Sequence, residues 1–273
     1  MSWTVGETVS ITANGKRLEG RCFGPSPGEA PTLVLLHEGL GSLGLWRDFP
    51  ERLQAATGCG VFVYSRAGYG HSEAATLPRP LDYMEREAID ALPDVLSAIG
   101  FREGVLIGHS DGATIAAQYA GGVEDLRIRG LVLIAPHFFT EPMGLAAIAD
   151  AKRDFETGDL REKLAKHHAD PEAAFRGWND AWLDPGFEEW NVAECIDYLR
   201  IPVLALQGRD DQYGTLPQIE EIETRIYSPV DVEILEGCGH APHVEKPEET
   251  LAAIADFVAR LRRIEAEVVD IPA

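Results

Sequence analysis

Two short stretches of alternating polar and apolar residues open the chain, and five continuous apolar runs follow them. The alternating stretches, Thr8–Ala13 and Arg17–Phe23, flank Asn14-Gly15, a dipeptide typical of a tight turn between antiparallel strands. Continuous apolar runs predict strands that are buried on both faces, as in a parallel sheet. The five runs are Thr32–His37, Gly60–Tyr64, Gly104–Gly108, Gly130–Ala135 and Ile201–Leu206.

Segments with helical periodicity lie between these runs. The expected helices are Leu81–Ile99, Asp111–Ala120, Gln218–Ile226 and Glu248–Arg263. Strands that alternate with helices predict an α/β fold with a mostly parallel, doubly wound sheet, here preceded by an antiparallel hairpin. Residues 264–273 are predicted to form a loosely held tail.

The alternation of strands and helices stops between Ala135 and Ile201. This stretch is longer than an ordinary connection, so we predict a helical insertion of about 60 residues. The predicted organisation is a core of residues 1–136 and 200–273 and a helical cap of residues 137–199. Aromatic rings of the cap either pack it onto the sheet or line an apolar substrate pocket. These rings belong to Phe175, Trp178, Trp182, Phe187 and Trp190.

Composition narrows the classes of function. The 273 residues include 24 Lys and Arg against 45 Asp and Glu, a net charge of −21 with histidine neutral. This excess of negative charge argues against nucleic-acid and anionic-membrane partners, which require basic patches. The N-terminus has neither the basic nor the apolar segment of a signal peptide, and no apolar run approaches the ~20 residues that span a bilayer. We therefore expect a cytoplasmic protein with a small-molecule substrate, and the sequence leaves a homodimer open.

The four cysteines, Cys22, Cys59, Cys195 and Cys238, are scattered along the chain. They form no closely spaced pair with the pattern of metal ligands. Free thiols in a reducing compartment are expected, with no metal and no cofactor.

The segment Gly108-His109-Ser110-Asp111-Gly112 follows an apolar run directly and precedes a predicted helix. A turn this tight between strand and helix forces its serine into a strained conformation, and small residues on either side allow the chain to pass. The Ser110 hydroxyl then stands at the carboxyl end of the strand, where free N–H groups face a developing anion. Ser110 is the candidate nucleophile.

A serine nucleophile needs a base and a residue that orients the base. Among eight histidines, His240 is the best placed, in a glycine-flanked loop after the predicted strand Val232–Leu235. Asp210 and Asp211 follow the run that ends at Leu206, and either could be the acid. The chain order serine, aspartate, histidine is the order used in this fold class.

With these residues the sequence resembles the α/β-hydrolase superfamily, in its capped esterase-, lipase- or haloperoxidase-like branch, over about Thr8 to Arg262. The resemblance implies a Ser110–Asp211–His240 triad, since the family spacing favours Asp211 over Asp210. It rests on the nucleophile turn and on segments similar to the family's oxyanion, glycine-rich, acid and base motifs. Those segments are His37–Ser42, Ser65–Ser72, Gly208–Asp211 and Gly239–Pro242.

Two residues depart from the family pattern. Glu38 stands where the family usually has glycine, and Ser65 where it usually has aspartate. The ungapped match assigns the oxyanion N–H to Gly39, partnered by that of Asp111, whereas a slide of one residue would assign it to Leu40. A Glu38 carboxylate beside this site would oppose the developing negative charge. We therefore expect it to point away or to be bound by Arg47 or Arg66.

Candidate substrate-binding residues come from the loops and from the cap. They are Glu38, Leu40, His137, Phe138, Trp178 and Trp182. His137 and Phe138 could either line the wall of the substrate pocket or pack in the hydrophobic core, and the sequence leaves both interpretations open. His167 and His168 are expected to be exposed.

These features predict a serine hydrolase that cleaves a small-molecule carboxylic ester through an acyl-enzyme intermediate. The same machinery serves thioesters, lactones and amides. Within the resemblance, Ser110 excludes the aspartate-dependent dehalogenases and epoxide hydrolases. Open alternatives are a hydrolase of C–C bonds in ring-cleavage products, a perhydrolase side activity and a non-catalytic ligand receptor on the same fold.

Overall fold

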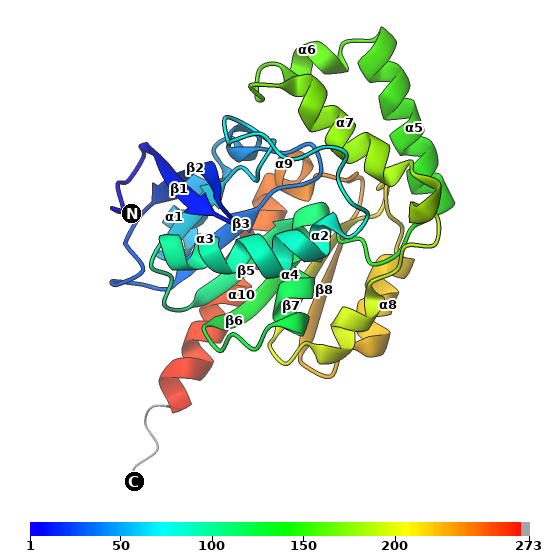
Figure 1. Ribbon diagram of the computed structural model, residues 1–273. Coiled ribbons are helices and arrows are strands. Elements are labelled where there is room, and N and C mark those ends of the chain that lie inside the picture. Colours follow the sequence, from blue (N-terminus) through cyan, green and yellow to red (C-terminus); the bar gives the residue numbers. More distant parts are fainter. Residues whose placement is uncertain (269–273) are drawn as a thin grey trace.

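A single sheet runs through the centre of the computed structural model, which describes the backbone of residues 1–268 and side chains as far as Ile264. Within that range the sheet has eight strands in the order β1-β2-β4-β3-β5-β6-β7-β8 (Figure 1). The pairs β1–β2 and β2–β4 are antiparallel and all other neighbours are parallel. The strands are β1 Thr8–Ala13, β2 Lys16–Phe23, β3 Thr32–Leu36, β4 Gly60–Tyr64, β5 Gly104–His109, β6 Ile128–Ile134, β7 Val203–Gly208 and β8 Val230–Leu235. This confirms the predicted α/β fold with its N-terminal antiparallel hairpin.

Helices cover both faces of the sheet. The α-helices are α1 Phe49–Thr57, α2 Tyr83–Arg86, α3 Leu92–Ala98, α4 Asp111–Gly122, α5 Pro142–Thr157, α6 Leu160–Leu164, α7 Pro171–Trp182, α8 Pro217–Arg225, α9 Pro242–Glu245 and α10 Pro247–Val268. Short 3-10 helices occur at Leu43–Trp46, Pro185–Phe187 and Ala193–Tyr198. No helix among residues 1–268 combines the length and apolar character needed to cross a membrane.

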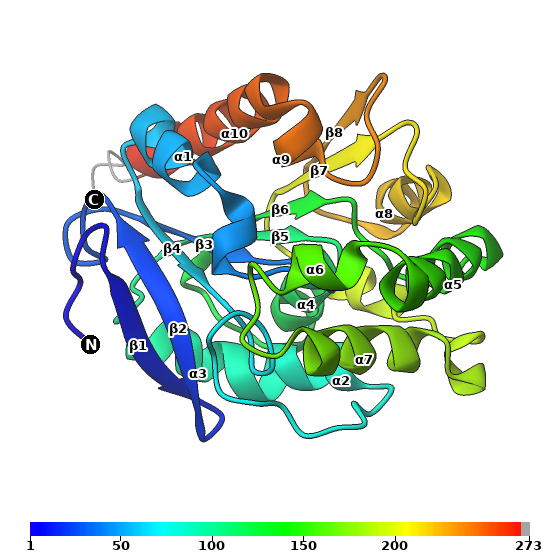
Figure 2. The same cartoon turned by 90° about the horizontal axis from the view of Figure 1, so that it is seen from above.

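The continuous apolar runs have a simple cause in this layered arrangement. Leu33 and Leu35 of β3 pack on the face that α1 and α10 cover, whereas Val34 and Leu36 pack on the face of α3 and α4. Figure 2 shows the sheet between these two groups of helices. Because successive side chains point to opposite faces and both faces are buried, residues 33–36 are all apolar, and Thr32 at the start is the one polar position of the strand.

The predicted hairpin turn is present between β1 and β2. Ala13 pairs with Lys16, and both residues between them have positive φ, 46° at Asn14 and 69° at Gly15. Two residues in this region give a turn whose twist matches that of the strands, which is why asparagine and glycine are favoured there.

The observed helices differ from the predicted ones at several points. The helix expected over Leu81–Ile99 is divided into α2, a π-helical turn at Glu87–Ala91, and α3. Pro93 near the start of α3 has no N–H to donate to the preceding turn, which interrupts the α-helical ladder. Helix α1 was not predicted, because its periodicity is short. Helix α10 continues through the first part of the predicted tail to Val268, and residues 269–273 lie outside the described range.

The segment between β6 and β7 is helical, as expected, and gathers at one end of the molecule. Helices α5, α6 and α7 lie together beside the loops at the carboxyl ends of the strands (Figures 1 and 2). Aromatic rings join α5 to α7, since Phe155 and Phe175 stack with centroids 3.9 Å apart, and in the segment after α7 Phe187 stacks on Trp190 at 5.0 Å. This packing joins the helices into one layer above the sheet edge.

Candidate active site

Ser110 occupies the sharp turn between β5 and α4. Its backbone has φ 53° and ψ −119°, a conformation that costs free energy in any residue other than glycine. A Cβ at Gly108 would lie 2.2 Å from the Gly112 carbonyl oxygen, and a Cβ at Gly112 would lie 2.1 Å from that of Leu36. The two glycines are therefore required sterically, because the turn brings backbone against backbone on both sides of Ser110.

His240 and Asp211 lie in hydrogen-bond contact at the ends of β8 and β7. The His240 Nδ1 is 2.7 Å from Asp211 Oδ2, so Nδ1–H donates and Nε2 is left free. Asp211 also accepts hydrogen bonds from the Gln207 side chain at 2.9 Å and the Tyr213 N–H at 2.8 Å. Burial alone would raise the pKa of Asp211, but its contacts with His240 hold that pKa below the ordinary value.

The structure distinguishes Asp211 from its neighbour Asp210. The Asp211 side chain is buried and faces His240, whereas Asp210 is exposed. Close backbone packing brings the two loops together: a Cβ at Gly208 would lie 2.0 Å from the Gly239 carbonyl oxygen. The base and acid loops thus meet because β7 and β8 are adjacent in the sheet.

The loop after β3 presents two N–H groups that donate to no acceptor among the described residues, those of Gly39 and Leu40. The carbonyls of His37 and Glu38 both accept from the buried guanidinium of Arg66. These contacts hold the backbone of the loop, and Gly39 and Leu40 line the same cavity as Ser110. The Asp111 N–H is also unpaired within the described residues, so the loop and the start of α4 can form an oxyanion hole.

The Glu38 carboxylate is bound by a histidine, and the expectation of Arg47 or Arg66 as its partner is wrong. Its Oε2 lies 3.4 Å from Nδ1 of His109, while Arg66 contacts only the Glu38 carbonyl. Glu38 also lines the cavity beside Ser110. The guanidinium of Arg66 donates instead to the backbone carbonyls of His37 and Glu38.

Ser65 is accommodated by an acid from another strand. Its hydroxyl donates to Glu19 Oε1 at 2.6 Å and accepts from the Leu43 N–H at 2.8 Å. Glu19 also accepts from the His71 N–H at 3.0 Å. A carboxylate therefore still anchors this turn, contributed by β2 where the family pattern has an aspartate at position 65.

A cavity of about 110 Å³ adjoins Ser110. The expected residues Glu38, Gly39, Leu40, Ser110, Asp111, His137, Trp178, Trp182 and His240 all line it, together with Ile148 and Tyr213. Phe138 does not, because it is fully buried in the core. Burial lowers the pKa of His137 to about 3, so this wall of the cavity is uncharged.

A hydrogen-bonded chain links the start of α4 to α7. Trp182 Nε1 donates to the Tyr83 hydroxyl at 3.0 Å, and that hydroxyl donates to Asp111 Oδ2 at 2.5 Å. Burial raises the pKa of Asp111, against the opposing effect of the Arg66 charge and the Tyr83 hydrogen bond. The sequence carried no signal for Tyr83, which lies in a helical segment with no motif.

The expectation that His168 is exposed is wrong. It is 4% exposed, its Nδ1 accepts from the Gly70 N–H at 2.9 Å, and its Nε2 donates to the Leu40 carbonyl at 3.0 Å. The loop between α6 and α7 is thereby tied to the loop that carries Gly39. Neither contact has a sequence signal, since the two segments are far apart along the chain.

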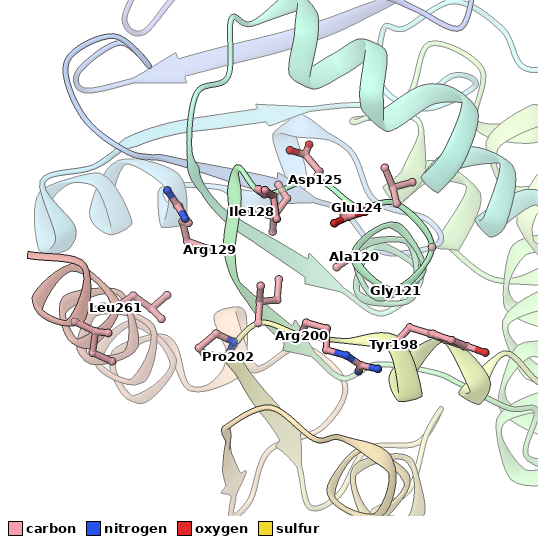
Figure 3. Close-up of a pocket in the computed structure, with 15 residues that line it drawn as sticks. Ala120, Gly121, Glu124, Asp125, Ile128, Arg129, Tyr198, Arg200, Pro202 and Leu261 are labelled. Atoms are coloured by element: carbon pink, nitrogen blue, oxygen red, sulfur yellow. The ribbon is translucent and has the colours of Figure 1, made fainter. Parts of the chain in front are cut away.

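A larger groove of about 670 Å³ lies at the opposite edge of the sheet, by the amino ends of β6 and β7 (Figure 3). It is bounded by the end of α4 and by side chains such as Ile128, Arg200 and Leu261. None of the residues that line it is a candidate for the chemistry, so the small cavity at Ser110 is the candidate site.

Comparisons with known proteins show which proteins the chain is similar to. Human 1-acylglycerol-3-phosphate O-acyltransferase ABHD5 is 28% identical over 141 residues, which cover 51% of this chain and 39% of that protein, about two fifths of its length. Proline iminopeptidase from Heyndrickxia coagulans is 26% identical over 297 residues, covering 91% of this chain and 97% of the relative. The crystal structure of the esterase RhEst1 from Rhodococcus sp. ECU1013 superposes with a TM-score of 0.71 at 20% identity, covering 93% and 99% of the two chains.

A family model described as the alpha/beta hydrolase family matches residues 33–254. The match extends from β3 to the middle of α10 and includes the nucleophile turn, the acid loop and the base loop. Together with the sheet order and the strained serine turn, it establishes that this chain belongs to the alpha/beta hydrolase family.

Proposed function

We propose that this protein is a serine hydrolase that cleaves a small carboxylic ester through an acyl-enzyme, with Ser110, His240 and Asp211 as its catalytic residues. One observation carries the proposal. Ser110, in its strained turn, lines the same cavity as His240, and the Nδ1–H of His240 donates a hydrogen bond to Asp211. This tautomer leaves Nε2 of His240 as the acceptor for the serine proton.

In the proposed mechanism, Ser110 Oγ attacks the ester carbonyl carbon while its proton passes to His240 Nε2. Asp211 remains ionised, keeps the ring in one orientation and stabilises its charged form. The N–H groups of Gly39 and Asp111 stabilise the oxyanion. The tetrahedral intermediate then collapses, and the leaving alcohol takes the proton from His240. In the second half, His240 activates a water that releases the acid and restores Ser110.

The size of the cavity supports a short acyl group. About 110 Å³ is well below the ~300 Å³ at which ligand pockets for drug-sized molecules begin. We infer that residues 137–199 act as a cap that sets this limit, because Ile148, Trp178 and Trp182 supply the apolar wall. The iminopeptidase and esterase names of the relatives support hydrolysis of an acyl bond and favour no single substrate.

An active-site-directed fluorophosphonate probe tests the proposal. Wild-type protein is expected to be labelled at one serine and Ser110→Ala to remain unlabelled. Ser97→Ala, which removes an exposed hydroxyl of α3, is the matched control and is expected to label like wild type. Absence of labelling in folded wild-type protein would contradict the catalytic proposal and favour a ligand receptor on the same fold.

A further inference from the structure

His109 links the two loops that flank Ser110. Its Nδ1 lies 3.4 Å from Glu38 Oε2, on the loop that carries Gly39, and its Nε2 lies 2.7 Å from the backbone carbonyl oxygen of His240. An ionised carboxylate and a carbonyl are acceptors only, so each ring nitrogen must carry a hydrogen to complete both bonds. The lowered pKa of Glu38 indicates an ionised carboxylate, and with that carboxylate the two contacts assign the imidazolium form to His109.

The surroundings of His109 make this charge state dependent on Glu38. His109 is 2% exposed, and burial alone would lower its pKa. The hydrogen bond and charge of Glu38, followed by the His240 carbonyl and the charge of Asp211, together raise that pKa above its ordinary value. The pKa of Glu38 is lowered, although burial opposes this, by the same contact with His109. Other titratable or charged groups face the pair from the neighbouring elements. They are His37 after β3, His137 after β6, Asp211 after β7, His240 after β8 and His243 in α9, and Arg47 in turn affects the pKa of His243.

His243 lies beside His109 but is uncharged. Its ring centroid is 4.8 Å from that of His109, and it packs against Trp46 at 4.6 Å. Burial lowers the pKa of His243 to about 3, and its Nδ1 makes no hydrogen bond within the described residues. The cluster thus contains one imidazole that bridges two loops and one beside it that only packs.

We propose that Glu38 and His109 form a charged positioning pair that fixes the position of the oxyanion loop relative to the His240 loop, on either side of Ser110. This inference rests on the proposed function, in which Gly39 and His240 act on the same substrate carbonyl. It gives Glu38 a role where the family pattern has glycine. The paired imidazolium also balances the carboxylate, which would otherwise oppose the oxyanion.

The proposal has a pH consequence. The pKa of His109 is raised in the folded protein, so its bridging form is complete below the unfolded-state value and is lost as pH rises through the folded value. Deprotonation removes one N–H, and either the Glu38 or the His240 contact is lost. We therefore expect kcat for a short p-nitrophenyl ester to fall on the alkaline side while the protein remains folded by circular dichroism.

Two substitutions of Glu38 distinguish the effect of its negative charge from the effect of its hydrogen bond to His109. In Glu38→Gln the amide can donate to a neutral Nδ1, which leaves Nε2–H on the His240 carbonyl. Whatever the rate of this variant at neutral pH, its kcat should no longer fall on the alkaline side. Glu38→Ala cuts the bridge, and kcat should fall at least about tenfold at all pH values, with a smaller change in KM. His243→Gln is the matched control, since it removes a buried imidazole beside His109 without cutting the bridge, and its alkaline fall should match that of wild type.

Nitrogen-15 NMR of histidine-labelled protein measures the protonation state of His109 without any substrate. At neutral pH, His109 should show two protonated ring nitrogens in wild type and one in Glu38→Gln, with His109→Gln identifying the signals. A neutral His109 in wild type, or an alkaline fall that is unchanged in Glu38→Gln, would overturn the proposal. If wild type neither hydrolyses esters nor reacts with the fluorophosphonate probe, the proposed function fails instead, and the NMR result still decides whether the charged pair exists.

Discussion

The indole Nε1 of Trp178 lies directly against Gly39, so close that a Cβ on Gly39 would come within 2.2 Å of it. Helix α7 therefore rests on the loop that would hold the oxyanion, with no space for a side chain between them. The backbone of Gly39 does not have a positive φ, so its need for glycine comes from this contact and not from its own conformation.

Gly39→Ala should lower kcat/KM by at least about 100-fold, because the added methyl group must displace either the indole or the loop N–H, and misplacement by about 1 Å has this effect on catalysis. Steady-state kinetics with p-nitrophenyl acetate measures the loss. The double variant Gly39→Ala with Trp178→Leu should regain part of it. Gly122→Ala, where a Cβ meets nothing within 4 Å, should behave as wild type. A fully active Gly39→Ala enzyme would show that this loop does not hold the oxyanion.

Asp211→Asn should reduce kcat by about 10⁴, since an amide can donate to His240 and stabilise the wrong tautomer. Rates with a saturating ester measure this, and Asp210→Asn is the matched control at the exposed neighbouring position. Equal losses in the two variants would contradict the assignment of Asp211 as the acid.

The stability of the same variant should depend on pH. The pKa of Asp211 is lowered in the folded protein, so its ionised form contributes stability above the unfolded-state value, and this contribution is lost as pH falls through the folded value. Urea unfolding should find Asp211→Asn less stable than wild type at pH 7, with the difference shrinking as the solution is made more acidic. A difference that grows toward acid pH would have the opposite sign to the one expected.

Tyr83→Phe should destabilise the protein by about 1–3 kcal/mol, because it leaves the buried Asp111 carboxylate and the Trp182 N–H without their shared partner. Urea unfolding followed by tryptophan fluorescence measures the change. Tyr227→Phe, at a side chain that is 84% exposed, is the control and should change stability little. A stability of Tyr83→Phe equal to wild type would mean that the chain of hydrogen bonds does not couple α4 to α7 energetically.

Ile148→Ala should shift substrate preference toward longer acyl chains. The side chain contributes to the wall of the cavity, so its truncation adds space where an acyl chain would extend. The ratio of kcat/KM for p-nitrophenyl hexanoate to that for the acetate measures the shift. Ile219→Ala, a buried isoleucine of α8 that does not line the cavity, should lose comparable stability with no change in this ratio.

Local pattern determined much of this protein. Apolar runs such as residues 33–36 revealed the parallel strands, because burial on both faces favours apolar side chains at successive positions. The glycines around Ser110 indicated the sharp turn, because only small residues allow backbone to pass backbone there. Asn14-Gly15 indicated the hairpin, because these two residues readily adopt the positive φ that the turn requires. Each of these signals lies within a few residues of the feature that it predicts.

Only the tertiary structure decided which side chains meet across the fold. Glu38 contacts His109, 71 residues later, and His168 reaches the Leu40 carbonyl across 128 residues. Phe138 turns into the core, although its neighbour His137 lines the cavity. Such contacts depend on strand order and on how helices α5–α7 pack above the sheet edge. A single sequence gives no local signal for these contacts, because the residues that meet are far apart along the chain and are brought together only by the folded structure.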